Sequence, residues 1–206
     1  MLLADSIADQ SFGVVCLQEV DRVCTRSEGV DMTQELASMA SYPYTYFIKI
    51  RDFQGGEYGT AILSRYPIIT AETRNFAVRI AKQGTSCGYA VLDVEGEHVT
   101  VFNTHLSVES DRANTETMLC LGDILSEHLQ KNKGRILCCG DFNTNPDKIA
   151  KHLPMFEYAN HGLHTYADRS IDNVLYLGYN VQNVHTRDTT ANCVTDHNML
   201  ICDVVL

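Results

Sequence analysis

Short strand-like segments, separated by turn residues, occupy most of this 206-residue chain and restrict the class of fold it can adopt. Apolar or alternating runs fall at 14–20, 44–50, 58–64, 74–80, 88–94, 98–106 and 136–139, and three more surround IDNVLYL, YNVQNVH and MLICDVV. Runs of this length and spacing are typical of a β-rich layer and not of a series of parallel βαβ units. The sequence therefore predicts a core built mainly from β-sheet.

Two helices are predicted between these strands, over residues 33–41 and 112–130. The second has an apolar stripe at helical spacing, formed by Met118, Leu121, Leu125 and Leu129. Because the strands come in runs with helices at intervals, we expect a sheet-on-sheet core with helices packed outside. No repeat or linker divides the sequence, so residues 1–206 are expected to form a single domain.

The charge and the cysteines exclude several classes of protein. The formal net charge of −10 argues against nonspecific electrostatic binding of nucleic acid. The eight cysteines form no C-x-x-C pair, so small buried thiols in a reducing compartment are favoured over a disulfide framework or a zinc site. No apolar run is long enough to span a bilayer, and the first residues do not form a signal peptide. The default expectation is a monomeric, cytoplasmic protein.

Polar side chains lie at the ends of, or within, six of the strand-like segments. They are Gln18 and Glu19; Glu57 and Tyr58; Asn103, Thr104 and His105; Asp141 and Asn143; Asp172; and Asp196 with His197. Taken singly, each has an ordinary explanation as a solvent-facing, capping or hydrogen-bonded structural residue. Burying the whole set without partners would be costly, so adjacent strands are expected to bring these groups together around a shared ligand.

The residue types indicate what that ligand is. Carboxylates and amides without clustered cysteines suit a hard cation, Mg²⁺ or Mn²⁺. Two histidines beside carboxylates suit proton transfer and the stabilisation of charge. Hydrolysis of a phosphate ester uses this combination of groups.

Six motifs in a fixed order carry a resemblance to a known family. LQEVD, GEYGTAILSRYPI, FNTHL, GDFN, SID and TDH, which together run from Leu17 to His197, resemble the endonuclease/exonuclease/phosphatase superfamily with its deoxyribonuclease-I-like fold. The resemblance implies an α+β fold, a four-layer α/β sandwich in which two packed, mainly antiparallel β-sheets are flanked by helices. It also implies a divalent-metal-dependent phosphoesterase that hydrolyses a phosphodiester or phosphomonoester by in-line attack of water.

The resemblance also implies roles for the acidic and amide residues. Glu19 would be the principal metal ligand, and Asp196 would join it directly or through water. The cofactor would be Mg²⁺, with Mn²⁺ as an alternative. Asp141 would position or activate the attacking water, and Asn143 would hold a phosphate oxygen.

Two histidines complete the implied site. His197, oriented by Asp172, would donate a hydrogen bond to the phosphoryl oxygen. His105 would be the second histidine that faces the phosphate, with Glu57 as its carboxylate partner. Tyr58 is a weaker candidate for the pocket wall.

The sequence departs from the family's pattern at its beginning. Members normally have a strand ending in a site asparagine before the QE motif, whereas only 18 residues precede Glu19 and no asparagine occurs before Asn75. We expect a truncated or misassigned start, because natural loss of an interior strand would expose ladder groups and apolar surface. The alternative is a non-catalytic binding module on the same scaffold, inactive through loss of its first core strand.

The scaffold does not specify the substrate. The few basic residues and the absence of tryptophan favour a compact phosphate ester over a long nucleic acid. Arg79, Lys82 and Arg112 lie in segments that would line the mouth of the site, and each is either a phosphate contact or an ordinary solvated surface charge. No cysteine stands at an evident helix start or in a basic pocket, so a thiolate nucleophile is not favoured.

Overall fold

A computed structural model describes residues 3–8, 12–78, 80–81, 85–132, 134–190 and 195–206. Its largest sheet joins six strands in the order β4-β5-β6-β7-β9-β8. They are β4 (Ile68–Asn75), β5 (Ser86–Val94), β6 (Glu97–His105), β7 (Ile136–Asp141), β8 (Glu157–Tyr158) and β9 (Asp172–Leu177). Only the pair β6–β7 is parallel, and the long helix α3 (Asp111–Asn132) makes the crossover that parallel neighbours require.

A second layer of strands packs on one face of this sheet. It contains a three-stranded antiparallel sheet of β1 (Val14–Arg22), β3 (Gly56–Ser64) and β2 (Tyr44–Phe53), in that order, and the antiparallel pair β10 (Asn180–Arg187) and β11 (Met199–Val205). Ile48 and Ile62 from the three-stranded sheet share one apolar cluster with Val101 and Leu137 from the six-stranded sheet, and Leu200 of β11 packs against it. The two layers therefore enclose a continuous core.

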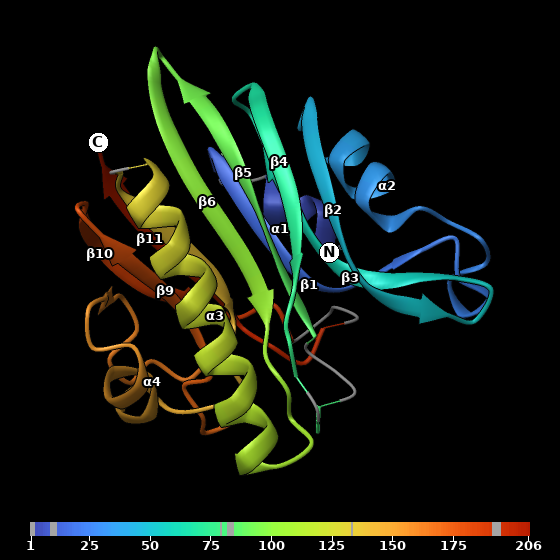
Figure 1. The fold of residues 1–206 in the computed structure, drawn as a ribbon. Coiled ribbons are helices and arrows are strands. Elements are labelled where there is room, and N and C mark those ends of the chain that lie inside the picture. The colour runs from blue at the N-terminus through green and yellow to red at the C-terminus, as the bar shows by residue number, and fades with distance from the viewer. Residues whose placement is uncertain (1–2, 9–11, 79, 82–84, 133, 191–194) are drawn as a thin grey trace.

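Helices cover both outer faces (Figure 1). The apolar stripe of α3 and Ile149 of α4 (Pro146–His152) pack on the far face of the six-stranded sheet. On the other side, Ile7 of α1 (Leu3–Ala8) and Ala37 of α2 (Met32–Met39) pack against Leu63 of β3. A single turn of 3₁₀ helix lies at Thr25–Ser27. The predicted architecture, two packed and mainly antiparallel sheets with flanking helices, is confirmed.

The secondary structure differs from the prediction at β4 and at α4, among other elements. The strand predicted at 74–80 is instead β4, Ile68–Asn75, an edge strand whose pairing with β5 ends at Asn75 opposite Ser86. Helix α4 was not predicted, although Asn145 caps it by accepting a hydrogen bond from the Lys148 N–H at 2.9 Å and proline occupies its first position.

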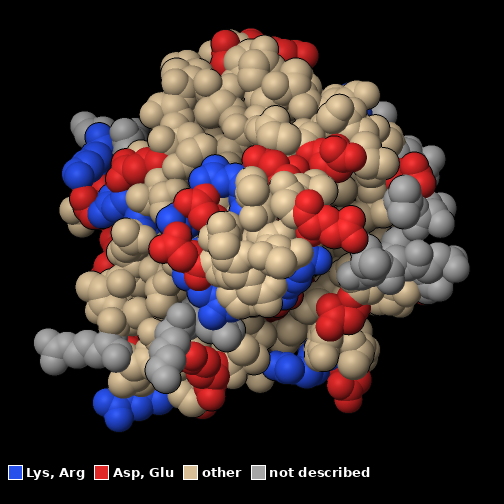
Figure 2. Space-filling model, turned by 90° about the vertical axis from the view of Figure 1, so that its right-hand side faces the viewer, with Lys and Arg blue, Asp and Glu red and all other residues tan. Residues whose placement is uncertain are grey.

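Strands β2 and β3 form a hairpin whose charged side chains are mostly paired. Lys49 Nζ lies 2.7 Å from Asp52 Oδ1 and 2.8 Å from Glu57 Oε1. Beside the hairpin, Arg22 of β1 pairs with Glu57, and Arg26 donates to both oxygens of the buried Asp21 at 2.7 and 2.8 Å. On the side of the molecule that carries this hairpin, acidic and basic side chains are intermixed (Figure 2). Among the described residues, no helix has the length and apolar character needed to cross a membrane.

Candidate functional site

Three of the predicted site residues lie in a row across neighbouring strands. His105 ends β6, Asp141 ends β7 and Asp172 begins β9, and the strand register places His105 beside Asp141 and Asp141 beside Asp172. Residues that face each other across paired strands point to the same side of a sheet. Two residues earlier on β6, Asn103 contacts the three-stranded sheet, so the row lies on the face that meets the second layer.

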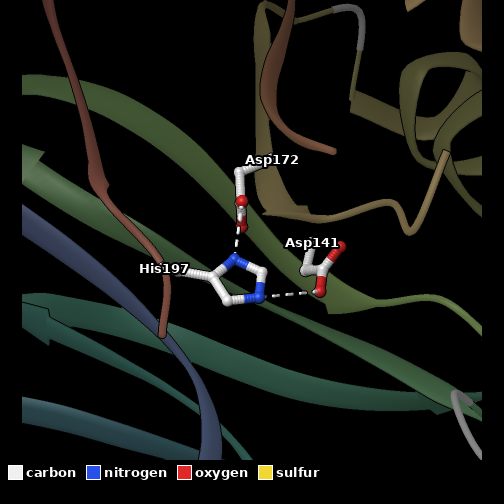
Figure 3. A group of neighbouring side chains, drawn as sticks. All are labelled: Asp141, Asp172 and His197. Atoms are coloured by element: carbon white, nitrogen blue, oxygen red, sulfur yellow. Dashed lines mark hydrogen bonds and ion pairs between the residues drawn. The ribbon is translucent and has the colours of Figure 1, made fainter. Parts of the chain in front are cut away.

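His197, just before β11, completes the group (Figure 3). Its Nδ1 lies 2.8 Å from Asp172 Oδ2, and its Nε2 lies 4.0 Å from Asp141 Oδ2. On the other side, His105 Nε2 lies 3.6 Å from the same Asp141 oxygen. The buried Asp141 carboxylate thus stands between two imidazole rings, and the predicted contact between Asp172 and His197 is present.

These neighbours shift the pKa values of the three groups in different directions. Burial and the charges of Asp172 and Glu19 raise the pKa of Asp141 to about 7, against the opposing effects of the Asn143 N–H and His197. Burial lowers the pKa of His197, but the hydrogen bond and charge of Asp172 outweigh it, so this pKa is raised. Burial lowers the pKa of His105. One histidine therefore favours the charged form and the other the neutral form, a difference typical of acid–base sites.

Glu19 reaches this group from the three-stranded sheet through an irregularity in β1. The pairing of β1 with β3 shifts register between Leu17 and Val20, and Glu19 itself has a left-handed backbone with φ of 57°. Burial, together with the charge and hydrogen bond of Glu19, raises the pKa of Tyr58. The side chain of Glu19 is exposed. Its negative charge adds to the raised pKa of Asp141 and opposes the lowering of the pKa of His105.

Asn103, one of the polar strand residues expected to face a shared ligand, instead anchors this part of β1. Its side chain is fully buried, and its Nδ2 donates to the carbonyl oxygens of Leu17 at 3.0 Å and Ala61 at 2.9 Å. Its Oδ1 accepts from Gln18 Nε2 at 2.8 Å. One amide thus joins β6 to β1 and β3 immediately before the irregularity at Glu19.

Asn143 is held against the site by the turn that follows β7. Its backbone N–H donates to Asp141 Oδ1 at 2.7 Å, and its Nδ2 donates to the Leu106 carbonyl at 2.9 Å. Its backbone is left-handed, with φ of 51°. Within the described chain, its amide oxygen and second amide hydrogen have no partner.

The arrangement of acids suits a divalent cation. One ligand atom from each of Asp141, Asp172 and His197 can be chosen so that all lie within 4.8 Å of one another, the only such group of three among the described residues. Burial contributes most to the raised pKa of Asp141, and the negative charges of Asp172 and Glu19 add to it. Oxygen ligands with excess negative charge fit a hard cation. Asp196 is exposed, and its negative charge contributes to the raised pKa of His197.

The predicted pairing of Glu57 with His105 is wrong. Glu57 forms ion pairs with Arg22 and with Lys49 Nζ, the latter at 2.8 Å. Adjacent residues of a strand point to opposite faces, and Tyr58 is the residue that meets Glu19. Glu57 therefore points away from the site.

The basic residues and cysteines considered in the sequence analysis are not part of the group formed by His105, Asp141, Asp172 and His197. Arg112 is exposed in the first turn of α3, and Arg79 and Lys82 lie outside the described residues. The seven cysteines of the described chain are free thiols, and burial raises the pKa of Cys87 and Cys202 to about 12. Such thiols are poor nucleophiles near neutral pH.

Three solved structures illustrate proteins with the same architecture, at sequence identities that show the fold alone. A mannosyl-6-phosphatase of Bacteroides thetaiotaomicron has 12% identity and a TM-score of 0.74, with 99% of this chain and 89% of that chain covered. The human Nocturnin catalytic domain has 19% identity and a TM-score of 0.76, with 98% and 83% covered. Sphingomyelinase C of Streptomyces griseocarneus has 17% identity and a TM-score of 0.68, with 97% and 90% covered.

Sequence comparison identifies the family. No curated protein sequence matches the chain. A profile of the Endonuclease/Exonuclease/phosphatase family, in contrast, matches residues 2–197, a range that contains every site residue described above. This protein belongs to the endonuclease/exonuclease/phosphatase family.

Proposed function

We propose that this protein is a divalent-metal-dependent phosphoesterase that hydrolyses a phosphodiester or phosphomonoester by in-line attack of water. The observation that carries the proposal is the position of Asp141. Its buried carboxylate lies between two histidines whose pKa values shift in opposite directions. A proton acceptor and two donors of different charge, converging on one point, are the groups that phosphoester hydrolysis requires.

Asp141 is the proton acceptor in this proposal. With a pKa of about 7, its carboxylate is basic enough near neutral pH to take a proton from an attacking water. The Asn143 N–H fixes one carboxylate oxygen at 2.7 Å and leaves the other facing the histidines. The Asn143 side-chain amide would hold a phosphate oxygen beside it.

His197 is the principal proton donor. Its Nδ1 is engaged by Asp172, so its Nε2 points into the site, and its raised pKa favours the charged form of the ring. A charged ring stabilises the negative charge that develops on the phosphoryl oxygens. His105, with a lowered pKa, would contribute a neutral ring at the opposite side of the phosphate.

A bound cation, Mg²⁺ or alternatively Mn²⁺, would neutralise phosphate oxygens and orient the substrate. Glu19 would be its principal ligand, with Asp196 joining directly or through water. The group of Asp141, Asp172 and His197 offers a second position, supported by the mutual proximity of its ligand atoms. Its Asp172–His197 hydrogen bond at 2.8 Å favours the acid–base role over ligation by that histidine.

A compact substrate is proposed because three basic side chains on one described side of the molecule are neutralised by acids. Around the β2–β3 hairpin, Arg22, Arg26 and Lys49 are each paired with an acid. Paired cations release fewer counterions on binding a polyanion than unpaired ones do. The intermixed charges in Figure 2 support the same view for that side of the molecule.

The test is hydrolysis of bis(p-nitrophenyl) phosphate and of its monoester, with added Mg²⁺ or Mn²⁺ and with a chelator. Turnover should require the cation and should be lost in His197→Ala. The matched control is His98→Ala, because His98 is an exposed histidine at the opposite end of the strand that carries His105. Equal turnover with and without the cation, or full activity in His197→Ala, would refute the proposal. Cation binding without any turnover would favour the rival function, a non-catalytic binding module on the same scaffold.

A further inference from the structure

The imidazole ring of His197 meets the neighbouring carboxylates at its edges (Figure 3). Its Nδ1 lies 2.8 Å from Asp172 Oδ2, whereas its Nε2 lies 4.0 Å from Asp141 Oδ2, which is too far for a hydrogen bond. The torsion that rotates a histidine ring about its Cβ–Cγ bond is broad. One hydrogen bond at Nδ1 therefore leaves the direction of Nε2 loosely defined unless another group packs against the face of the ring.

Tyr166 is the group that packs there. The centroid of its ring lies 4.8 Å from that of His197, and the two planes are inclined by 41°. This spacing lies within the range of favourable aromatic pairs. Tyr166 is half-buried, and its hydroxyl makes no hydrogen bond within the described chain. The side chain is therefore held by the packing of its ring.

The turn that carries Tyr166 is closed by hydrogen bonds. It lies between β8 and β9, where the N–H groups of Thr165 and Tyr166 donate to the Arg169 carbonyl at 2.9 and 3.1 Å. In return, the Arg169 N–H donates to the Tyr166 carbonyl at 2.8 Å. The ring of Tyr166 thus projects from a fixed backbone.

Thr165 joins this turn to both partners of the hydrogen bond between Asp172 and His197. The Thr165 side chain is fully buried, and its Oγ1 accepts from the Asp172 N–H at 3.2 Å. Its carbonyl accepts from the N–H of Asn198, the residue after His197, at 2.7 Å. The His197 carbonyl accepts from the buried Thr189 hydroxyl at 2.7 Å. The backbones of both partners and the turn that carries Tyr166 therefore form one hydrogen-bonded unit.

We propose that Tyr166 is a positioning residue, whose ring limits the rotation of the His197 imidazole and keeps Nε2 directed at the phosphate. Asp172 holds Nδ1 at the edge of the ring, and Tyr166 blocks movement at its face. Such support matters because a displacement of about 1 Å can lower a rate about a hundredfold. The inference rests on the proposed function, since it concerns the histidine that acts as proton donor in that reaction.

The kinetic test compares two substitutions of Tyr166 with bis(p-nitrophenyl) phosphate in Mg²⁺ or Mn²⁺. Tyr166→Ala removes the ring, so kcat should fall about tenfold to a hundredfold while KM stays within about twofold of the wild type. Tyr166→Phe removes only the hydroxyl, so both constants should stay within about twofold. The matched control is Tyr158→Ala, because Tyr158 forms a similar tilted pair with His161, at 4.6 Å and 47°. This control should leave kcat and KM unchanged.

A spectroscopic measurement on the free protein separates positioning from contact with the substrate. Two-bond proton–nitrogen NMR spectra of histidine-labelled protein observe each ring through its carbon-bound protons, and His197→Ala identifies the His197 signals. These signals should be sharp in the wild type, Tyr166→Phe and Tyr158→Ala, and broadened or doubled in Tyr166→Ala. Tyr166→Leu, which fills the space without a flat ring, should behave like Tyr166→Ala. It replaces that variant if circular dichroism shows that Tyr166→Ala is unfolded.

The outcomes separate this inference from the proposed function. Unchanged kcat and sharp ring signals in Tyr166→Ala would overturn the positioning role while the phosphoesterase stands. A raised KM with an unchanged kcat would also overturn it, since the tyrosine would then contact the substrate directly. The same holds for a lower kcat with ring signals that stay sharp. If the wild type hydrolyses no ester with any cation, the proposed function fails, and the ring signals alone decide whether Tyr166 holds His197.

Discussion

At the scale of single residues, Asp172 determines the charge of His197. The carboxylate holds His197 Nδ1 at 2.8 Å, and its hydrogen bond and charge are the largest effects that raise the pKa of that ring. Asp172→Asn removes the charge, so the pKa of His197 should fall and the ring should lose its proton at a lower pH. The rate of phosphoester hydrolysis should fall by about 10²–10⁴ at neutral pH, the range typical when a histidine loses its orienting acid.

This prediction is checked by NMR titration of His197 and by the pH–rate profile. The limb on which activity falls as pH rises should move to lower pH in Asp172→Asn. Asp203→Asn, at an exposed position on β11, is the control that should leave both curves in place. An unchanged pKa of His197 in Asp172→Asn would contradict the proposed role.

Glu57 provides a test of the same kind with the opposite expectation. Because Glu57 pairs with Arg22 and Lys49 and not with His105, Glu57→Gln should leave kcat within about twofold of the wild type. The loss of these partly exposed ion pairs should lower the free energy of unfolding by less than about 1 kcal/mol. The assay and urea denaturation measure both quantities. A fall in kcat comparable to that of Asp172→Asn would mean that the carboxylate reaches His105 after all.

At the scale of secondary-structure elements, Asn103 joins three strands at the point where β1 becomes irregular. Asn103→Ala would leave the carbonyls of Leu17 and Ala61, and the amide of Gln18, without their buried partner. We expect the free energy of unfolding to fall by about 2–4 kcal/mol, measured by urea denaturation, because several polar groups lose partners at once. Thr73→Ala, which removes one hydrogen bond to Tyr46 from the edge strand β4, should cost less than about 1.5 kcal/mol. Equal losses in the two variants would contradict the anchoring role.

The same elements show how far the sequence predicts the site. The sequence predicts where β6 and β7 end and where β9 begins, because apolar runs stop at His105 and Asp141 and a strand begins at Asp172. Register then brings these three together without further information. The sequence does not predict the face of the strand on which Glu57 lies, because irregular pairing in β1 and β2 changes which residues oppose Tyr58. Such irregularities depend on contacts between the two strand layers, here those of Asn103. The local pattern of apolar and polar residues along one strand therefore does not predict them.

At the scale of the whole molecule, both strand layers contribute to the site. Glu19 comes from the three-stranded sheet, the row of His105, Asp141 and Asp172 comes from the six-stranded sheet, and His197 precedes β11. A cation held by groups from both layers would bind the folded state and not the unfolded chain. It would therefore raise the free energy of unfolding of the entire sandwich, by about 2.7 kcal/mol at a hundred times its Kd.

Thermal unfolding with and without Mn²⁺ or Mg²⁺ measures this linkage. A gain of 2.7 kcal/mol in a domain of this size corresponds to a rise in Tm of about 5–10 °C. The rise should be much smaller in Glu19→Gln and unchanged in Glu35→Gln, since Glu35 is exposed in the first turn of α2. No rise in the wild type at any cation concentration would remove the basis for a metal-dependent reaction.

The pH dependence of the rise follows from Asp141. Its folded pKa, about 7, lies above the value near 3.9 of an unfolded chain, so ionisation of Asp141 destabilises the folded state as pH rises from about 4 to 7. A cation relieves the repulsion among these acids, and it competes with the proton on Asp141 below pH 7. The rise in Tm should therefore be larger at pH 8 than at pH 6, and Asp141→Asn should remove most of that difference. A pH-independent rise would place the cation away from Asp141, at exposed acids that stay ionised throughout this range.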